Sequence, residues 1–270
     1  MTVAEPLRIA LFGASGSIGS AIAAEALARG HVVVAVARDP GRVDRAALAA
    51  AADALAAPGA PAADRLGATT GPPAADRPGA TGPSAADRPG ATGDPDAAQR
   101  LSVVTGDATD AACVAAVAGD CDVVVSAVGG AAQGQPDIVV EAAHALVDGV
   151  RRAGHARLFV VGGAGSLQHP DGGRLHDQPD FPDAWKPSSH AQGRALEVYR
   201  QAGDAVDWTY LSPAHVIEPG QRTGRYRTGG DAAVFDAAGA SRITIPDYAV
   251  AALDELEAPR FRGRRFTIGY

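Results

Sequence analysis

The chain has 270 residues, 46% of them hydrophobic and 20% charged, and its formal net charge is −7. This length and composition are typical of a globular protein with a substantial core. The interspersed acidic and basic residues argue against a nucleic-acid partner, and no apolar run approaches the roughly 18 residues of a membrane span. The N-terminal MTVAEPLRIALFG lacks a basic leader, so we expect a cytoplasmic protein with neither a nucleic-acid nor a membrane partner. Cys113 and Cys121 match no disulfide framework or zinc pattern.

Short Val-rich runs alternate with longer amphipathic stretches along the chain. The first five expected strands lie in LRIALFG, HVVVAVA, LSVVTGD, CDVVVSAVGG and RLFVVGGAG, and helices are expected near Ser17 to Arg29, Ala111 to Ala118 and Ile138 to Ala153. Such runs are typical of parallel strands buried on both faces. Their alternation with helices predicts one α/β domain, residues 1–270, with a Rossmann-type doubly wound parallel sheet and a small C-terminal substrate-side region.

The segment 58–95 interrupts this pattern between the second and third expected strands. It contains PAADRLGATTGP, PAADRPGATGP and SAADRPGATGDP, three near-copies of one unit, and it is nearly free of large apolar side chains. Such a composition buries too little surface to offset its ordering entropy. We therefore expect a disordered repeat insertion in a surface loop, with a partner-binding role as the alternative.

The stretch LFGASGSIGS carries a glycine motif directly after the first expected strand. Gly13, Gly16 and Gly19 form the pattern GxxGxxG at the opening of a helix. Glycines allow a tight turn and a close approach of the backbone to a pyrophosphate, and the helix N-terminus offers free N–H groups. In this strand-turn-helix context the motif predicts a dinucleotide site.

The second expected strand ends in VAVARDP, which bears on the choice of cofactor. NAD enzymes usually carry an acidic residue here, whereas Arg38 suits the 2′-phosphate of NADP. Asp39 follows immediately and could instead be a turn residue before Pro40, and Arg38 could alternatively be a solvated loop charge. We favour NADP(H) over NAD(H).

Other cofactor contacts are expected beyond the carboxyl ends of the remaining strands. Asp107 lies where the adenine is usually bordered, and the residues after the fourth strand lie where the nicotinamide ribose is expected. The full expected set is Gly13, Ser15, Gly16, Ser17, Ile18, Gly19, Arg38, Asp107, Ala108, Ala127, Val128, Gly129 and Gly162.

With these motifs the chain resembles the atypical branch of the short-chain dehydrogenase/reductase superfamily, which includes NmrA-like proteins and the biliverdin-IXβ reductase/flavin reductase type. The resemblance rests on GASGSIG, ARDP, TGDATD, VSAVGG, VVGGAGS, WTYLSPAHVIEPGQRTGRY and SRITIPDYA, and it spans the chain except for the insertion. It implies a monomer or homodimer.

The superfamily's common mechanism uses a Tyr and a Lys four residues apart. Lys186 is the one lysine in the chain, and Pro182 stands four residues before it. In SSHAQGRALEVY the same spacing is filled by His190 and Arg194, which would share a helix face. His190 could donate a proton and Arg194 could hold ribose or phosphate, although many atypical members carry unrelated residues here.

Two further residues are candidates for the substrate side. Ser166 follows the fifth strand in GGAGS, near the superfamily's active-site Ser, and could orient a substrate, although loop polarity explains it equally well. His215, in LSPAHVIEPG, aligns with a His of the flavin-reductase type. It would border the substrate or nicotinamide, or would be a structural His bonded to backbone.

Loops 166–187 and 219–231 are expected to form the substrate side. In the first, Phe181 and Trp185 are interpreted as pocket walls or lid anchors. His169, Asp171, His176 and Asp177 have no standard metal-site spacing. In the second loop, the three arginines of RTGRYRTGGD could face an anionic substrate or could be solvated.

These features predict an NADPH-dependent reductase that transfers hydride to a flavin, quinone or similar conjugated acceptor, a small-molecule substrate, without a Tyr-Lys pair. One alternative is an NmrA-like redox sensor that binds the dinucleotide without turnover. Another is an epimerase or dehydratase that uses the cofactor internally.

Overall fold

The computed structural model describes residues 5–57, 96–154 and 156–270. The insertion expected at 58–95 lies outside these residues. The strands are β1 (Arg8–Phe12), β2 (Val32–Ala37), β3 (Leu101–Thr105), β4 (Val123–Ser126), β5 (Arg157–Val161), β6 (Trp208–Ser212), β7 (Val216–Glu218), β8 (Arg227–Gly229), β9 (Arg242–Thr244) and β10 (Arg264–Gly269). The α-helices are α1 (Ser17–Ala28), α2 (Arg45–Ala56), α3 (Ala111–Ala118), α4 (Ile138–Ala153), α5 (Lys186–Ala202) and α6 (Ile245–Glu257).

One large sheet organises the molecule. Its strand order is β3-β2-β1-β4-β5-β6-β10-β8, and every neighbouring pair is parallel except β10 with β8. The chain winds outward from β1 in both directions, which is the doubly wound Rossmann order. This confirms the predicted fold class. A separate two-stranded sheet pairs β7 with β9.

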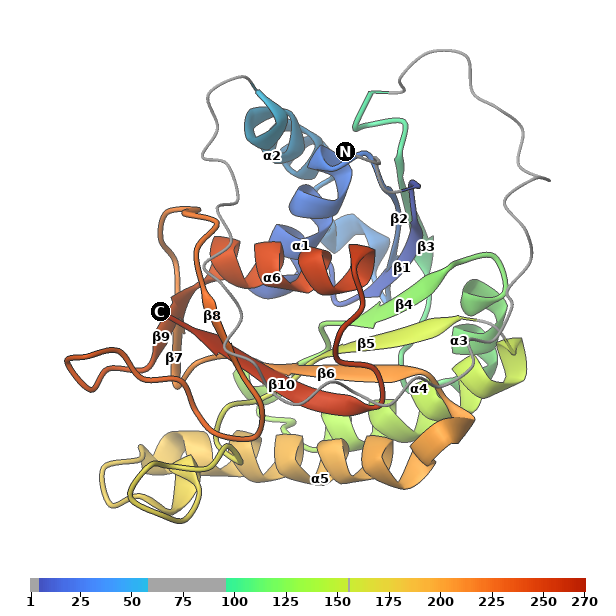
Figure 1. Ribbon diagram of the computed structural model, residues 1–270. Helices are drawn as coiled ribbons and strands as arrows, with labels where there is room; N and C mark the ends of the chain where they lie inside the picture. The colour runs from blue at the N-terminus through green and yellow to red at the C-terminus, as the bar shows by residue number, and fades with distance from the viewer. Residues whose placement is uncertain (1–4, 58–95, 155) are drawn as a thin grey trace.

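Helices cover both faces of this sheet. Helices α1, α2 and α6 lie on one face, and α3, α4 and α5 on the other (Figure 1). Strand β1 shows why both faces need cover: Ile9 and Leu11 belong to one apolar core, whereas Ala10 and Phe12 belong to the other. Alternate side chains of a strand point to opposite faces, so a strand that is apolar throughout requires helices on both sides.

The predicted helix bounds agree closely with the structure. The helices at Ala111–Ala118 and Ile138–Ala153 are as expected, and the first ends at Ala28, one residue before the expected Arg29. Helix α3 begins after Asp110, whose carboxylate accepts the N–H of Ala112 at 2.9 Å. No helix of the described ranges has the length and apolar character needed to cross a membrane.

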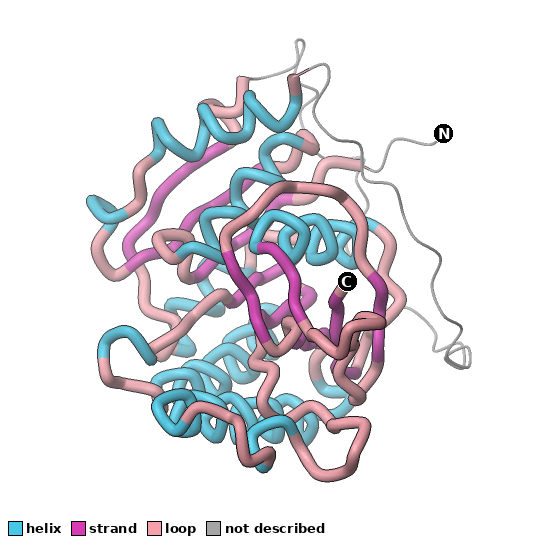
Figure 2. Tube along the Cα trace, turned by 90° about the vertical axis from the view of Figure 1, so that its left-hand side faces the viewer, coloured by secondary structure: helices cyan, strands magenta, loops and turns pink. Residues whose placement is uncertain are grey.

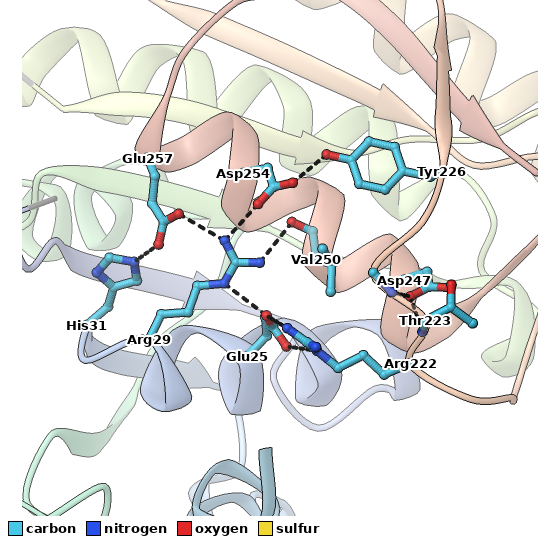
Figure 3. A network of polar contacts seen from close by, with 11 residues as sticks. Glu25, Arg29, His31, Arg222, Thr223, Tyr226, Asp247, Val250, Asp254 and Glu257 are labelled. Atoms are coloured by element: carbon cyan, nitrogen blue, oxygen red, sulfur yellow. Dashed lines mark hydrogen bonds and ion pairs between the residues drawn. The ribbon is translucent and has the colours of Figure 1, made fainter. Parts of the chain in front are cut away.

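A buried charge network joins α1 to α6 (Figure 3). The Arg29 guanidinium lies 2.9 Å from carboxylate oxygens of Glu25, Asp254 and Glu257. Burial alone would lower the pKa of Arg29, but these carboxylates outweigh it and raise that pKa. The other Glu257 oxygen lies 3.0 Å from Nε2 of His31. The network therefore fixes the helix that follows the glycine motif against the C-terminal helix.

The same network extends to the loop 219–231. The Arg222 guanidinium donates to both carboxylate oxygens of Glu25 at 2.8–2.9 Å. Asp247, which is fully buried, accepts the N–H groups of Thr223 and Gly224 at 2.8 and 2.7 Å. Arg222 is therefore neither solvated nor directed at a substrate, and both sequence interpretations of this arginine are wrong.

Candidate functional site

A cleft of about 650 Å³ opens at the carboxyl ends of β1 to β5. Its volume lies within the roughly 300–1,000 Å³ that is usual for cofactor sites. Figure 2 looks onto this side of the molecule, where the C-terminus and the surrounding loops lie. The cleft is lined by Phe12, Gly13, Ser15, Gly16, Ser17, Ile18, Gly19, Val36, Ala37, Arg38, Asp39, Arg42, Gly106, Asp107, Ala108, Thr109, Ala127, Val128, Gly129, Ala131, Gln133, Ile138, Val161, Gly162 and Gln192. Every residue expected from the sequence to bind the cofactor is among them.

The glycine motif forms one wall of the cleft, between β1 and α1. Gly13 has a φ of +89°, and a Cβ there would lie 2.4 Å from the carbonyl oxygen of Ala127. A Cβ at Gly19 would lie 2.1 Å from the carbonyl oxygen of Gly13. At Gly16 the nearest atom would be 3.5 Å away, so its missing side chain leaves room on the cleft side. Gly13 and Gly19 thus allow the turn, and Gly16 leaves the backbone open to a ligand.

Two arginines flank the end of β2. Arg38 follows the strand, and Arg42 lies in the short 3₁₀ helix η1 (Pro40–Arg42); both are exposed and line the cleft. Between them Asp39 accepts the N–H of Gly41 at 3.0 Å and so caps this turn. Since a capping carboxylate is already engaged, the geometry supports the turn interpretation of Asp39. Sequence reasoning missed Arg42, although its place four residues after Arg38 in ARDPGR was a usable signal.

The turn after β3 forms the next part of the wall. The Asp107 carboxylate accepts the N–H and the hydroxyl of Thr109, each at 2.9 Å. Beside it, a Cβ at Gly106 would lie 2.5 Å from Val36 and 2.7 Å from Cys113. Asp107 therefore holds its own loop in shape and lines the cleft, and its second oxygen has no hydrogen-bond partner in the described part of the chain.

The opposite end of the cleft is formed by Val161, Gly162 and Gln192. Gln192 projects from α5, and its Oε1 accepts the Tyr210 hydroxyl at 2.9 Å. The same hydroxyl accepts the N–H of Gly163 at 3.1 Å. The bond from the Tyr210 hydroxyl orients the amide with Oε1 toward Tyr210. The Nε2 group of Gln192 has no hydrogen-bond partner within the described ranges. Burial raises the pKa of Tyr210 to about 12, so this tyrosine is a fixed donor behind the wall.

His190 and Arg194 lie on a different face of α5. Both are exposed, and neither lines the cleft. Arg194 pairs with Asp137, just before α4. The residue of α5 that lines the cleft is Gln192, two positions after His190 and two before Arg194. The side of α5 that faces the sheet is marked by Ser189, Ala195 and Tyr199, which are buried in the structure. Their spacing along the helix was the sequence signal for the orientation of α5.

His176 and Ser189 form a buried pair beside His190. Nδ1 of His176 lies 2.8 Å from the Ser189 hydroxyl, and both residues are buried. The His176 and His190 rings are 4.5 Å apart, centre to centre. Burial, with a smaller contribution from His190, lowers the pKa of His176, which favours its neutral form.

His215 lies in an aromatic cluster. Its ring centre is 5.5 Å from that of Phe181 and 5.9 Å from that of Trp185. The Nδ1 atom of His215 is buried with no hydrogen-bond partner among the described residues. Burial also lowers the pKa of this imidazole. The structure thus brings together His215 and the two aromatic residues that the sequence assigned to the substrate side.

Loops 166–187 and 219–231, which the sequence analysis assigned to the substrate side, are joined to each other. Ser166 accepts a hydrogen bond from Arg265 at 2.8 Å, and Arg265 also donates to Asp231 at 2.6 Å. Leu167, Leu175 and Phe181 form a small apolar core under the first loop. The hydroxyl of Ser166 is therefore held in place, outside the cleft wall. In the described part of the chain no three His, Cys, Asp or Glu side chains gather as a metal site would require.

Comparisons with known proteins agree with this geometry. Residues 84–256 match the model of a family described as NAD(P)H-binding. The chain is 46% identical over 150 residues to the uncharacterized protein YwnB of Bacillus subtilis, an alignment that covers 54% of this chain and 70% of the relative. A solved structure from Burkholderia pseudomallei, provisionally named an exported protein, is 37% identical with a TM-score of 0.72, and covers 98% of this chain and 100% of its own. A Bacteroides thetaiotaomicron structure, provisionally named an epimerase, is 31% identical with a TM-score of 0.72 and covers 98% of both chains.

Proposed function

This chain belongs to the NAD(P)H-binding family, and from that premise we propose that it is an NADPH-dependent reductase of the atypical short-chain dehydrogenase/reductase type. The proposed reaction transfers hydride to a conjugated small-molecule acceptor such as a flavin or quinone. The observation that carries this proposal is the neutral amide of Gln192, rather than a Tyr-Lys pair, at the Gly162 end of the cleft.

The cleft fits a dinucleotide by the shape of its glycine wall. The pyrophosphate would lie over Gly16 at the N-terminus of α1, where the backbone N–H groups of the first turn are free of helical partners. The nearest protein atom to a Cβ at Gly16 would be 3.5 Å away, so the protein itself does not require a glycine there. A ligand that approaches the backbone closely does require one.

Two arginines and one engaged carboxylate favour NADPH over NADH. Arg38 and Arg42 both line the cleft at the end of β2, and guanidinium groups suit a phosphate with paired hydrogen bonds. Asp39, the residue that could favour the ribose of NAD, caps the turn at Gly41 instead. We assign the 2′-phosphate to this arginine pair.

At the other end, the chain's own residues offer neutral donors. When bound, the nicotinamide supplies the hydride. Gln192 presents its Nε2 donors to the cleft because the Tyr210 hydroxyl holds Oε1. Neither residue carries a positive charge that would stabilise a localised alkoxide. This supports an acceptor that spreads the added electron pair over a conjugated system and takes its proton from solvent.

The decisive experiment is NADPH oxidation by the purified protein with a panel of flavins, quinones and activated carbonyls, followed by absorbance at the NADPH band. We expect turnover with flavins or quinones and little with simple ketones. Tight NADPH binding without turnover on any acceptor would instead favour a redox sensor. Conversion of a sugar or alcohol without net cofactor consumption would favour the epimerase activity that the name of the Bacteroides relative suggests.

A further inference from the structure

His176 fastens loop 166–187 to the helix that carries Gln192. Its Nδ1 atom lies 2.8 Å from the hydroxyl of Ser189 on α5, and both side chains are buried. Its backbone N–H donates to the carbonyl oxygen of Gly165 at 2.9 Å. His176 therefore joins three segments of the chain, which are its own loop, the turn that follows β5, and α5.

The contacts of His176 lie just behind the Gly162 end of the cleft. A Cβ at Gly165 would lie 1.8 Å from the Ser189 hydroxyl oxygen and 3.4 Å from Cβ of His176, so these three residues are closely packed. Gly165 follows the cleft-lining Gly162 by three residues, and Ser189 precedes the cleft-lining Gln192 by about one helical turn. The position of His176 thus bears on two residues of the cleft wall.

The apolar support of loop 166–187 is small. Three buried side chains, those of Leu167, Leu175 and Phe181, form its core, separate from the two large cores that flank the sheet. Segments with few buried apolar contacts open locally at a lower free energy than the central strands of a sheet. The closed position of this loop therefore depends on polar contacts such as those of His176.

The surroundings of His176 disfavour a second proton on its ring. The centre of the His190 ring lies 4.5 Å from that of His176, and Arg174 in the same loop adds a positive charge. Asp177 opposes these groups with a carboxylate oxygen 3.8 Å from Nε2, but its side chain is 58% exposed. The uncharged neighbours are Gly165, Phe181 and Ser189. Burial, His190 and Arg174 together outweigh Asp177 and lower the pKa of His176.

We propose that the contact between His176 and Ser189 is an acid-sensitive clasp, which holds loop 166–187 against α5 while His176 is neutral and releases the loop when His176 takes a proton. In the open loop the imidazolium is hydrated and is no longer beside the His190 ring. Mild acid thereby loosens the wall behind the Gly162 end of the cleft. The inference concerns how the loop is held, and it does not depend on the reductase reaction.

The test is amide hydrogen exchange of the full chain at pH 7.5 and pH 5.5. The N–H groups of Leu175 and His176 report on the loop, because they donate to the carbonyl oxygens of Leu167 and Gly165 at 2.9 Å each. The protection factor of each amide is compared, since it removes the pH dependence of intrinsic exchange. In the open loop His176 regains the ordinary histidine pKa of about 6.5, so its protonation should lower the protection factors by about fivefold to tenfold over this range.

Three variants assign the change to the clasp. His176→Gln cannot take the proton, and its protection factors are expected to change by less than about twofold between the two pH values. Ser189→Ala removes the hydroxyl, so its loop should be less protected than that of the parent at pH 7.5 and should keep the pH dependence. The exposed His144 on α4 provides the control, and His144→Gln is expected to behave like the parent.

Several outcomes would overturn the clasp. These are pH-independent protection in the parent, or an equal loss of protection in the parent and His176→Gln. Protection of Leu175 equal to that of Phe159 on β5 would do so as well, because the loop would then open only when the whole protein unfolds. Parent-like protection in Ser189→Ala at pH 7.5 would remove the hydrogen bond from the inference, even if His176→Gln failed to fold.

The proposed function is tested separately, by NADPH oxidation on the acceptor panel. Failed turnover together with loop opening that depends on pH and on His176 would overturn the reductase and leave the clasp in place. Turnover together with pH-independent loop protection would support the reductase and overturn the clasp.

Discussion

The Tyr210 hydroxyl donates to the side-chain oxygen of Gln192 at 2.9 Å. Tyr210 lies on β6, fully buried behind Gly162, where a Cβ would come within 2.0 Å of its ring. The chain thus keeps a tyrosine near the Gly162 end of the cleft but places it behind the wall. Its hydroxyl orients a neighbouring amide and has no open path to a ligand.

We predict that Tyr210→Phe retains most of the reductase activity. A residue that transfers a proton in the transition state contributes about 10²–10⁴-fold to the rate, whereas loss of one neutral hydrogen bond costs about 1 kcal/mol, or roughly fivefold. The measurement is kcat and KM for NADPH oxidation between pH 6 and pH 9. We expect no new ionisation in the profile, because burial raises the pKa of Tyr210 to about 12.

Gln192→Ala provides the comparison for that variant. Removing the amide should lower kcat/KM by about tenfold, the loss of one or two hydrogen bonds, with stability near that of the parent since Gln192 is only half-buried. A loss of 10²-fold or more in Tyr210→Phe, with Gln192→Ala unaffected, would make Tyr210 the acid and contradict the assignment.

The residues expected to bind the cofactor and those expected on the substrate side differ in how well the sequence predicted their positions. The glycine motif and Arg38 each directly follow a strand in the sequence, so chain connectivity alone puts them at the strand ends. All of the expected cofactor residues line the cleft. The roles of His190 and Arg194 depended on the helical register of α5 and on its partners. Arg194 pairs with Asp137, 57 residues away in the chain. No local pattern reports such a contact, and the Arg222–Glu25 pair was missed for the same reason.

The arginine pair at the end of β2 leads to a test of cofactor choice. We predict that Arg38→Ala and Arg42→Ala each weaken NADPH binding by about tenfold to a hundredfold, the value of one charge-assisted hydrogen bond of about 1.5–3 kcal/mol. NADH binding should change by less than about twofold, since it lacks the phosphate. Fluorescence titration with both cofactors measures this, and Arg151→Ala on the exposed face of α4 is the control. Equal losses for the two cofactors would refute the 2′-phosphate assignment.

Two glycines of one motif should respond differently to the same substitution. In Gly19→Ala the new Cβ meets the carbonyl oxygen of Gly13 at 2.1 Å, whereas in Gly16→Ala its nearest neighbour is 3.5 Å away. We therefore expect Gly19→Ala to lower the melting temperature and Gly16→Ala to leave it nearly unchanged. Both should lose NADPH binding, because the Gly16 Cβ would occupy the side from which a pyrophosphate approaches. Normal NADPH affinity in a folded Gly16→Ala protein would exclude the proposed pyrophosphate position.

The lowered pKa of His176 predicts how the free energy of unfolding varies between pH 7.5 and pH 5. Burial lowers its pKa in the folded protein, so below the ordinary pKa of about 6.5 the unfolded chain binds a proton that the folded protein resists. The stabilisation is complete above that value and declines as the pH falls through it. Urea unfolding at several pH values should show this decline, and His176→Gln should reduce the slope. The exposed residue His144 provides the control variant, His144→Gln. If the free energy of unfolding fell with pH equally steeply in the parent, His176→Gln and His144→Gln, the decline would come from other groups.

The last prediction concerns the ion network that links α1 to α6 (Figure 3). Arg29 contacts three carboxylates, at 2.9 Å each, so Arg29→Met leaves buried charges without their main partner and should destabilise the fold by about 3–5 kcal/mol. Arg222→Met leaves Glu25 paired with Arg29, and its cost should be smaller, about 1–3 kcal/mol.

The exposed pair of Arg151 and Asp148 gives the matched control, because Arg151→Met removes a solvent-screened surface contact that contributes little to stability. Chemical denaturation of the three variants measures the series. Burial is the reason that we expect Arg29→Met to be the most destabilising of the three variants. The side chains of Arg29 and its carboxylate partners are largely buried, whereas those of Arg151 and Asp148 remain hydrated. If Arg29→Met and Arg151→Met were equally stable, the network would carry no more stability than a surface pair, and the tie between the two helices would rest on their apolar contacts alone.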